Sequence, residues 1–316
     1  MRYLAAMVLL AAGAAVAAFP VKPVRLVTPY PPGGGTDLVA RAMAQSFAKA
    51  WGQPVVVDNR GSGGGVIAAQ MAAAAAPDGY TLMLANSAVM LTAPMMMKGA
   101  AGYDPYEDFA PVGLVTTLPA FLLAQASLPA TSVQDVIAMA RATPGKLAFS
   151  SSGAGGGGYL SAELLKSLAK IDIINVPYKG GGPAIVALLS GEVQFTFGNY
   201  TAARAHLLTH RIKAIAVASA KRTVLMPHVP TLIEAGLADF EYSSWYAFYY
   251  PPRAPRDIVD NVNRETRRTL ADRALSDMLL QQGAEATPGT PEELHHMMRA
   301  EQARWGRLVK GQQLKL

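Results

Sequence analysis

The sequence PPGGGTD at residues 31–37 lies between an apolar run over 24–30 and a run over 37–51 with apolar residues at helical spacing. Two further glycine-rich loops, 61–65 and 150–158, have the same kind of neighbours. Glycine lets the backbone approach a ligand closely, and the start of the following helix offers unpaired N–H groups at its positive dipole end. Such junctions favour binding of a carboxylate or a phosphate without a charged side chain.

The first 18 residues have the pattern of a secretory signal peptide. Residues 3–18 are almost wholly apolar, follow a single Arg2 and end in small residues before Phe19. A membrane-spanning helix needs roughly 20 apolar residues, so an N-terminal anchor fits this run less well. We therefore expect a periplasmic protein that is exported through a cleavable signal peptide.

The composition is typical of a folded globular protein. Hydrophobic residues make up 51% of the 316 residues and charged residues 16%, which excludes a disordered chain and suffices for two domains. Cysteine is absent, which excludes thiol catalysis, thiolate metal sites and thiol redox chemistry. The net charge of +6 is modest, and the arginines of 264–273 are interleaved with acidic residues as on a solvated helix face. We expect a monomer that binds no nucleic acid.

Strand-like and helix-like runs alternate along the chain, which predicts an α/β fold with mostly parallel sheets and helices on both faces. A tail of helices after 255, with no strand after Tyr249, is expected to pack back on the first unit. The prediction is two lobes joined by two crossings: 19–118 with 248–316 form lobe one, and 119–247 forms lobe two. The expected strands are 24–30, 55–58, 80–85, 121–125, 146–150, 173–176, 193–197 and 214–218, and the expected helices are 37–51, 66–76, 133–141, 159–170, 183–190, 202–209, 255–271, 273–282 and 291–310.

Two such lobes place a cleft at the carboxyl ends of the strands, where open sheets bind ligands. The first glycine loop belongs to lobe one and the third to lobe two, so a ligand held by both would draw the lobes together by hinge closure. The sequence thus predicts a binding protein. The candidate ligand-binding residues are Gly33, Gly34, Gly35, Thr36, Asp37, Asn86, Ser87, Ser151, Ser152, Gly153, Gly155, Gly156, Tyr178, Asn199, Tyr200 and Trp245.

Several of these candidates have a second interpretation. The pairs Thr36-Asp37 and Ser151-Ser152 suit either bonds to a carboxylate or capping of the next helix, with Thr36 as a possible N-cap. Asn86-Ser87 either completes the site or simply ends a strand. Lys179 pairs with a second carboxylate or is merely solvated. The aromatic stretch over 242–250 is expected at the second crossing, where it packs the hinge and the core; the alternative is that Trp245 covers a bound ligand.

Six short segments stand in order along the chain: PGGGTD at 32–37, VDNR at 57–60, PDGYTL at 77–82, VPYKG at 176–180, PHVPT at 227–231 and EAG at 234–236. In order and spacing they resemble the Bug, or TctC-type, receptors of tripartite tricarboxylate transporters. The resemblance implies the two-lobed type II periplasmic binding protein fold, with a cleft that captures a small organic acid and hands it to a membrane permease. It also implies that the loops at 33–37 and 150–157 grip one carboxylate chiefly through main-chain N–H groups and hydroxyls. Tyr159 stands where family members commonly carry histidine, so the identity of the ligand does not transfer.

Two enzyme classes are the alternatives. A dinucleotide-binding oxidoreductase is suggested by residues 153–158, which satisfy G-x-G-x-x-G, but Asp172 precedes its strand where the fingerprint acid should end it. A hydrolase lacks the G-x-S-x-G elbow, and His206 with His210 lacks the glutamate of H-E-x-x-H. We therefore expect no catalysis, no cofactor and no metal.

Overall fold

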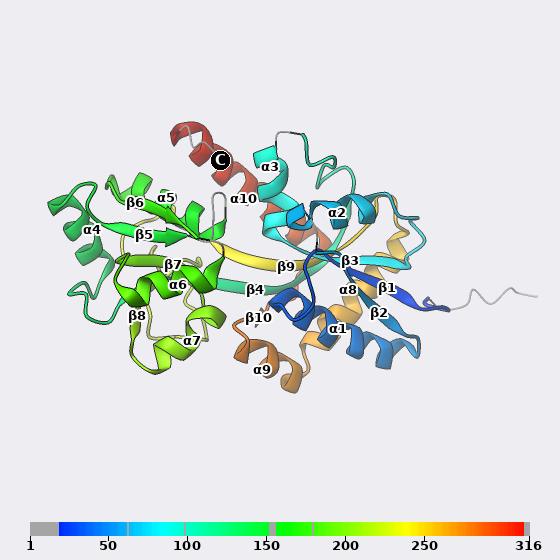
Figure 1. Cartoon of the computed structure of the whole chain (residues 1–316). Coiled ribbons are helices and arrows are strands. Elements are labelled where there is room, and N and C mark those ends of the chain that lie inside the picture. The colour runs from blue at the N-terminus through cyan, green and yellow to red at the C-terminus, as the bar shows by residue number, and fades with distance from the viewer. Residues whose placement is uncertain (1–18, 62, 98, 152–155, 179, 313–316) are drawn as a thin grey trace, which may run out of the picture.

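The structure is a computed structural model that describes residues 19–312 except 62, 98, 152–155 and 179. Figure 1 shows two α/β lobes side by side, lobe one around β1–β3 and lobe two around β5–β8, with β4 and β9 running between them. The expected signal peptide, residues 1–18, lies outside the described residues. The strands are β1 (Val24–Thr28), β2 (Val55–Asn59), β3 (Thr81–Asn86), β4 (Ala110–Gln125), β5 (Ala148–Ser151), β6 (Ile174–Pro177), β7 (Phe195–Asn199), β8 (Ile212–Val217), β9 (Ser243–Tyr250) and β10 (Glu285–Ala286). The helices are α1 (Gly35–Trp51), η1 (Gly63–Gly65), α2 (Val66–Ala73), η2 (Ala88–Thr92), α3 (Ala93–Met97), α4 (Val133–Ala142), α5 (Gly157–Ala169), α6 (Gly181–Ser190), α7 (Tyr200–Leu208), α8 (Arg256–Leu270), α9 (Arg273–Gln281) and α10 (Pro291–Gln312).

The strands form a mixed sheet that runs through both lobes in the order β2-β1-β3-β9-β4-β7-β5-β6, with β8 and β10 also paired to β4. Its two ends are parallel, as expected, because β1 pairs with β2 and β3, and β5 pairs with β6 and β7. Its centre is antiparallel. β4 pairs with β9 over 110–119 and then with β7 and β8 over 120–125. The expected lobe boundaries at 118/119 and 247/248 stay a prediction.

Two strand expectations were wrong. The strand expected over 121–125 begins eleven residues earlier, at Ala110. Prolines and glycines in that earlier part obscured it in the sequence. The aromatic stretch expected as the second crossing does run between the lobes, and it does so as strand β9, which lies between β3 and β4 in the sheet. A strand does occur after Tyr249: β10 is two residues long and is held by pairing with Thr116 and Thr117 of β4.

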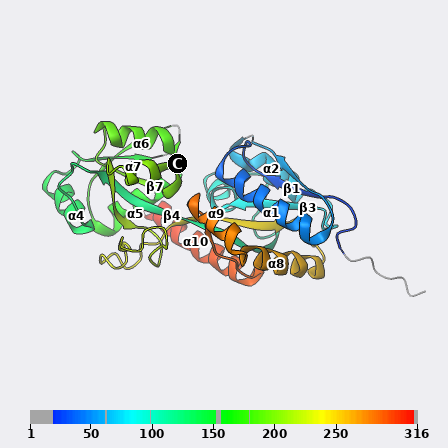
Figure 2. The same ribbon diagram turned by 90° about the horizontal axis from the view of Figure 1, so that it is seen from below.

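Helices cover both faces of the sheet in each lobe. In lobe one, α1 and α8 share an apolar core on one face, while α2 and the first half of α10 share the core on the other. In lobe two, α4 and α5 cover one face and α6 and α7 the other. Figure 2 shows α10 running along the junction of the two lobes. Within the described ranges, no helix has the length and apolarity needed to cross a bilayer.

Candidate functional site

Four helices that follow parallel strands begin at a glycine. The N-caps of α1, α2, α5 and α6 are Gly34, Gly65, Gly156 and Gly180, and no described side chain caps them. In contrast, side chains cap α4, α7 and α9. Because the first N–H groups of a helix have no partner inside it, the glycine starts leave donors for an anion at the carboxyl ends of β1, β2, β5 and β6. The interpretation of Thr36 as the N-cap was wrong, because the helix begins at Gly35, two residues before the expected start at Asp37, and its N-cap is Gly34.

Asp37 holds the first glycine loop in shape. Its Oδ2 accepts hydrogen bonds from Gly33 N at 2.9 Å and Arg41 Nε at 2.9 Å, and its Oδ1 accepts one from Asn59 Nδ2 at 3.0 Å. Asn59 Nδ2 also lies 3.1 Å from the carbonyl oxygen of Tyr30, which leads into the loop. Burial alone would raise the pKa of Asp37, but these hydrogen bonds bring it below its ordinary value. The Asp37 carboxylate therefore faces the loop, where Arg41 balances its charge.

Strand β9 and the residue just before it lie against the starts of α1 and α5. Tyr246 Oη, from β9, would be 3.3 Å from a Cβ placed on Gly35, and a Cβ on Gly157 would overlap the hydroxyl of Tyr242, which immediately precedes β9. Four residues of extended chain span roughly 13 Å. Helix starts from the two lobes thus meet two tyrosines at the start of one strand, roughly one small ligand apart.

Further hydroxyl groups, those of Tyr30, Ser87 and Ser244, lie beside these two tyrosines. Ser244 lies between them in sequence, and its Oγ is 3.4 Å from the Oγ of buried Ser87. Burial raises the pKa of Tyr30, a hydrogen bond with Asn86 lowers it, and neighbouring Tyr246 raises it again. Burial likewise raises the pKa of Tyr246, with an opposing contribution from its hydrogen bond to Thr36. We name this group, which presents neutral hydroxyls at ordinary pH, the hydroxyl floor; it consists of Tyr30, Ser87, Tyr242, Ser244 and Tyr246.

Asn86 and Ser87 are brought to this group as expected from the end of β3. Asn86 Nδ2 lies 3.0 Å from Tyr30 Oη, and its Oδ1 accepts a hydrogen bond from Val89 N at 3.1 Å. Ser151 ends β5 but is buried, and its Oγ donates to Asn175 Oδ1 at 2.8 Å. Ser152, Gly153 and Gly155 lie outside the described residues.

The remaining candidates are not brought to the hydroxyl floor. Asn199 Oδ1 caps α7 through Ala202 N at 3.0 Å, and Tyr200 packs on Phe121. The hydroxyl of Tyr178 lies beside Glu192, which raises its pKa to about 12. Trp245 is 1% exposed and points to the opposite face of β9 from Tyr246, because neighbouring strand residues alternate in direction.

Sequence reasoning did not assign Tyr30, Asn59, Tyr242, Ser244 or Tyr246 to the site. The pattern Tyr242-x-Ser244-x-Tyr246 has the two-residue period of a strand and could have indicated that these hydroxyls share a face. This alternation was hard to recognise because every residue from Trp245 to Tyr250 is apolar or aromatic. Only the pairing of β9 with β3 and β4 places these side chains beside the glycine loops.

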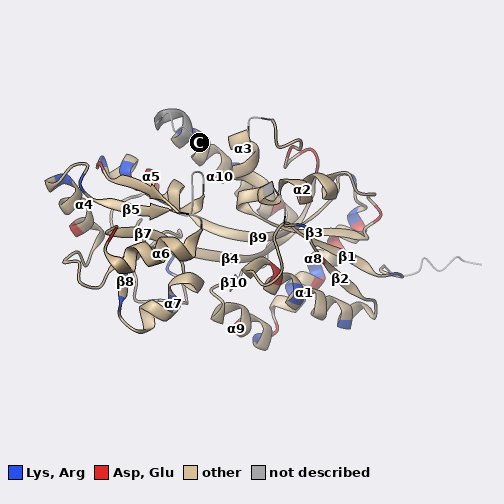
Figure 3. Cartoon of the chain, viewed as in Figure 1, with Lys and Arg blue, Asp and Glu red and all other residues tan. Residues whose placement is uncertain are grey.

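The strands beside the hydroxyl floor are uncharged, and the acidic residue expected of a dinucleotide-binding fingerprint is not near the start of α5. Neither β4 nor β9 contains a charged residue, so the strands between the lobes are tan in Figure 3. Asp172 precedes β6 and so lies at the opposite sheet edge from the start of α5. In the described part of the chain, no three histidine or acidic residues cluster as a metal site would require.

The fold, with helix starts from two lobes meeting on a shared strand, is that of two-lobed periplasmic solute-binding proteins. A structure described as a TctC solute binding protein from Polaromonas aligns with a TM-score of 0.83, at 26% identity, over 93% of this chain and 99% of that one. The model of the tripartite tricarboxylate transporter family receptor matches residues 39–314, and the chain belongs to this family.

Relatives at higher identity include proteins solved with carboxylates. Protein BugT of Bordetella pertussis is 34% identical over 92% of this chain and 90% of its own length. An R. palustris protein described with adipate is 36% identical, with a TM-score of 0.78 over 92% of this chain and 97% of that one. MatC from Rhodopseudomonas palustris, described with bound malate, is 33% identical, with a TM-score of 0.75 over 92% and 100%. Their family is one of solute receptors rather than enzymes.

Proposed function

We propose that this chain captures a small organic carboxylate between its lobes in the periplasm and delivers it to the membrane permease of a tripartite tricarboxylate-type transporter. Membership of the receptor family supports the role in transport. The adipate and malate of two relatives support the ligand class. The single observation that carries the proposal is that glycine-started helices from different lobes, α1 and α5, lie against Tyr246 of β9 and against Tyr242, the residue just before it.

The carboxylate would sit between the starts of α1 and α5, above the hydroxyl floor. Main-chain N–H groups of the two loops donate to it, and neighbouring hydroxyls of Thr36 and Tyr246 add to them. Neutral donors form charge-assisted bonds with an anion, and the fold orders them before the ligand arrives. When the lobes close, water is excluded and these bonds strengthen.

Calorimetric titration of the mature protein, from Phe19 onward, with adipate, malate, benzoate and NADH tests the ligand class. Gly34→Leu should weaken binding of the responding acid at least about tenfold, because the new side chain occupies the opening beside the α1 donors. Gly306→Leu is the matched control, since a Cβ at either glycine has no neighbour closer than 4.0 Å. Binding of NADH alone, or equal affinities in both variants, would refute the site.

Delivery is tested separately in cells that lack this chain. The wild-type chain should restore uptake of the acid that the purified protein binds, while Gly34→Leu should restore it poorly at limiting concentrations. If Gly34→Leu supports uptake as fast as the wild type, delivery does not depend on this site.

A further inference from the structure

Helix α10 joins the cores of the two lobes. Leu294 and Met298, near its start, are buried with α2 and β3 in lobe one. Trp305 and Leu308, two turns later, are buried with α5 in lobe two. A helix anchored in both cores must shift against one of them when the lobes move, so its contacts at the junction bear on the hinge.

The middle of α10 holds β9 through a buried carboxylate. Trp245 Nε1 donates to Glu301 Oε2 at 2.8 Å, and Trp305 Nε1 donates to Glu301 Oε1 at 3.1 Å. Glu301 is only 9% exposed, and burial raises its pKa. A buried carboxylate is tolerated only where donors satisfy it, so the two indole N–H groups are what keep Glu301 in place.

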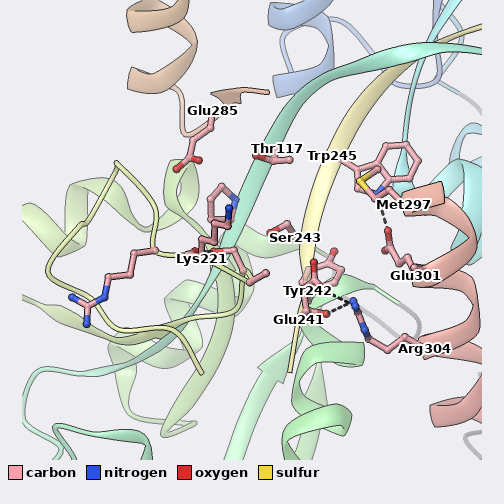
Figure 4. Close-up of a pocket in the computed structure, with 15 residues that line it drawn as sticks. Thr117, Lys221, Glu241, Tyr242, Ser243, Trp245, Glu285, Met297, Glu301 and Arg304 are labelled. Atoms are coloured by element: carbon pink, nitrogen blue, oxygen red, sulfur yellow. Dashed lines mark hydrogen bonds and ion pairs between the residues drawn. The ribbon is translucent and has the colours of Figure 1, made fainter. Parts of the chain in front are cut away.

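One turn further along, α10 holds the segment that enters β9. Arg304 Nη1 donates to the carbonyl oxygen of Glu241 at 2.9 Å, and Arg304 Nη2 pairs with the Glu241 carboxylate. A cavity of about 380 Å³ adjoins these contacts and is also lined by Thr117 of β4 (Figure 4). Beside this open space, the strand is held by its pairing with β4 on one edge and by these few polar contacts to α10.

We propose that Glu301 is a positioning residue for ligand capture: through Trp245 it fixes β9 so that the hydroxyl floor stays aligned with the starts of α1 and α5. Ser244 and Tyr246 flank Trp245 in sequence and point to the other face of the strand, where Tyr246 lies beside the start of α1. Any displacement of Trp245 therefore moves both hydroxyls. The proposal rests on the proposed function for its ligand. In addition, it holds that Glu301 helps to set the position of one lobe relative to the other.

Two variants separate this role from simple stabilisation. Trp245→Phe and Trp305→Phe each remove one indole donor from the same carboxylate and keep an aromatic ring. The first loses the bond between α10 and β9, whereas the second loses a bond within α10. Adipate and malate are the probes, and calorimetric titration gives the affinities.

We expect Trp245→Phe and Glu301→Leu, which removes both acceptor oxygens, to weaken binding about tenfold, the equivalent of one hydrogen bond to a charged group, and Trp305→Phe to weaken it less than about twofold. Saturating acid should close the lobes in the wild type and in all three variants. Under that condition the four proteins should have the same lobe separation. Equal losses of affinity in Trp245→Phe and Trp305→Phe would show that Glu301 only stabilises the fold.

The lobe separation is measured independently of any ligand. The chain has no cysteine, so Val56→Cys in lobe one and Val186→Cys in lobe two, which are 55% and 62% exposed, carry a spin-label pair. Without ligand, Trp245→Phe should broaden the distance distribution, and Trp305→Phe should leave it unchanged. An unchanged distribution in Trp245→Phe overturns the proposal even if neither acid binds, whereas failure of binding alone would count only against the proposed function.

Discussion

At the scale of single residues, this site separates the groups that shape the loops from the groups available to a ligand. The polar atoms of Asp37 and Asn59 form hydrogen bonds within the first loop and between its flanking residues, and the amide of Asn86 is hydrogen-bonded to Tyr30 and to Val89 N. The remaining donors are main-chain N–H groups and hydroxyls. Buried polar groups that are fully satisfied hold one conformation, which is what a preorganised anion site needs.

Substitution of Asp37 tests this division. Asp37→Asn should lower the free energy of unfolding by roughly 1–3 kcal/mol, because a nearly buried side chain loses charge-assisted bonds to Gly33 N and Arg41. It should also weaken carboxylate binding, since the loop loses its brace. Chemical denaturation and titration measure both.

Arg41→Gln is the matched control because it removes only the exposed partner of the same ion pair, and the expected loss is at most about 1 kcal/mol. Should Arg41→Gln prove as harmful as Asp37→Asn, the ion pair and not the bond to the loop would be the important contact.

At the scale of elements, β9 is the piece whose role sequence patterns concealed. The helices α1, α2 and α4 to α10 were predicted to within three residues at each end, because amphipathic periodicity and helix-ending signals are local. The short helices η1, η2 and α3 were not predicted. β9 is buried on both faces from Trp245 to Tyr250, so it lacks alternation. The first half of β4 is partly exposed, but Pro111 and Gly113 disguise it. The glycine loops were located from local sequence, but the hydroxyl floor depends on long-range pairing, which one sequence does not reveal. The ligand contacts themselves stay a prediction.

The N-terminus of helix α4 tests how one capping carboxylate makes the free energy of unfolding depend on pH. Hydrogen bonds from Thr131 N, the Ser132 and Thr131 hydroxyls and Ser132 N lower the pKa of Asp135 to about 2. Because the folded pKa is depressed, the ionised group stabilises the fold above its unfolded pKa near 4 and loses this effect as pH falls through about 2. Asp135→Asn should therefore be less stable than the wild type at pH 7, and the difference should shrink between about pH 4 and pH 2.

Urea unfolding at several pH values measures this difference. Asn199→Ala removes an uncharged cap, whose Oδ1 accepts from Ala202 N, so its loss of about 1 kcal/mol should not change over the same range. A gap between Asp135→Asn and the wild type that persists at pH 2 would contradict the assigned pKa.

At the scale of the whole molecule, the two lobes are parts of one sheet and not separate domains on a tether. β4 contributes 16 consecutive residues to it and changes partners from β9 to β7 and β8 at the junction. α10 contributes to a core in each lobe. The lobes can therefore rotate only by bending strands β4 and β9 and shifting α10, which favours a small hinge motion over free separation.

This continuity predicts how the molecule unfolds. Loss of either lobe would strip partners from β4 and from α10, so scanning calorimetry should show one cooperative transition with equal calorimetric and van't Hoff enthalpies. A bound carboxylate at about 100 times its dissociation constant adds roughly 2.7 kcal/mol, which should raise the midpoint of that single transition by about 4 °C. Two transitions, of which the acid shifts only one, would mean that the lobes fold independently and that the ligand contacts one of them alone. The contacts of α1 and α5 with β9 argue for the single transition, because a ligand held between them stabilises both lobes at once.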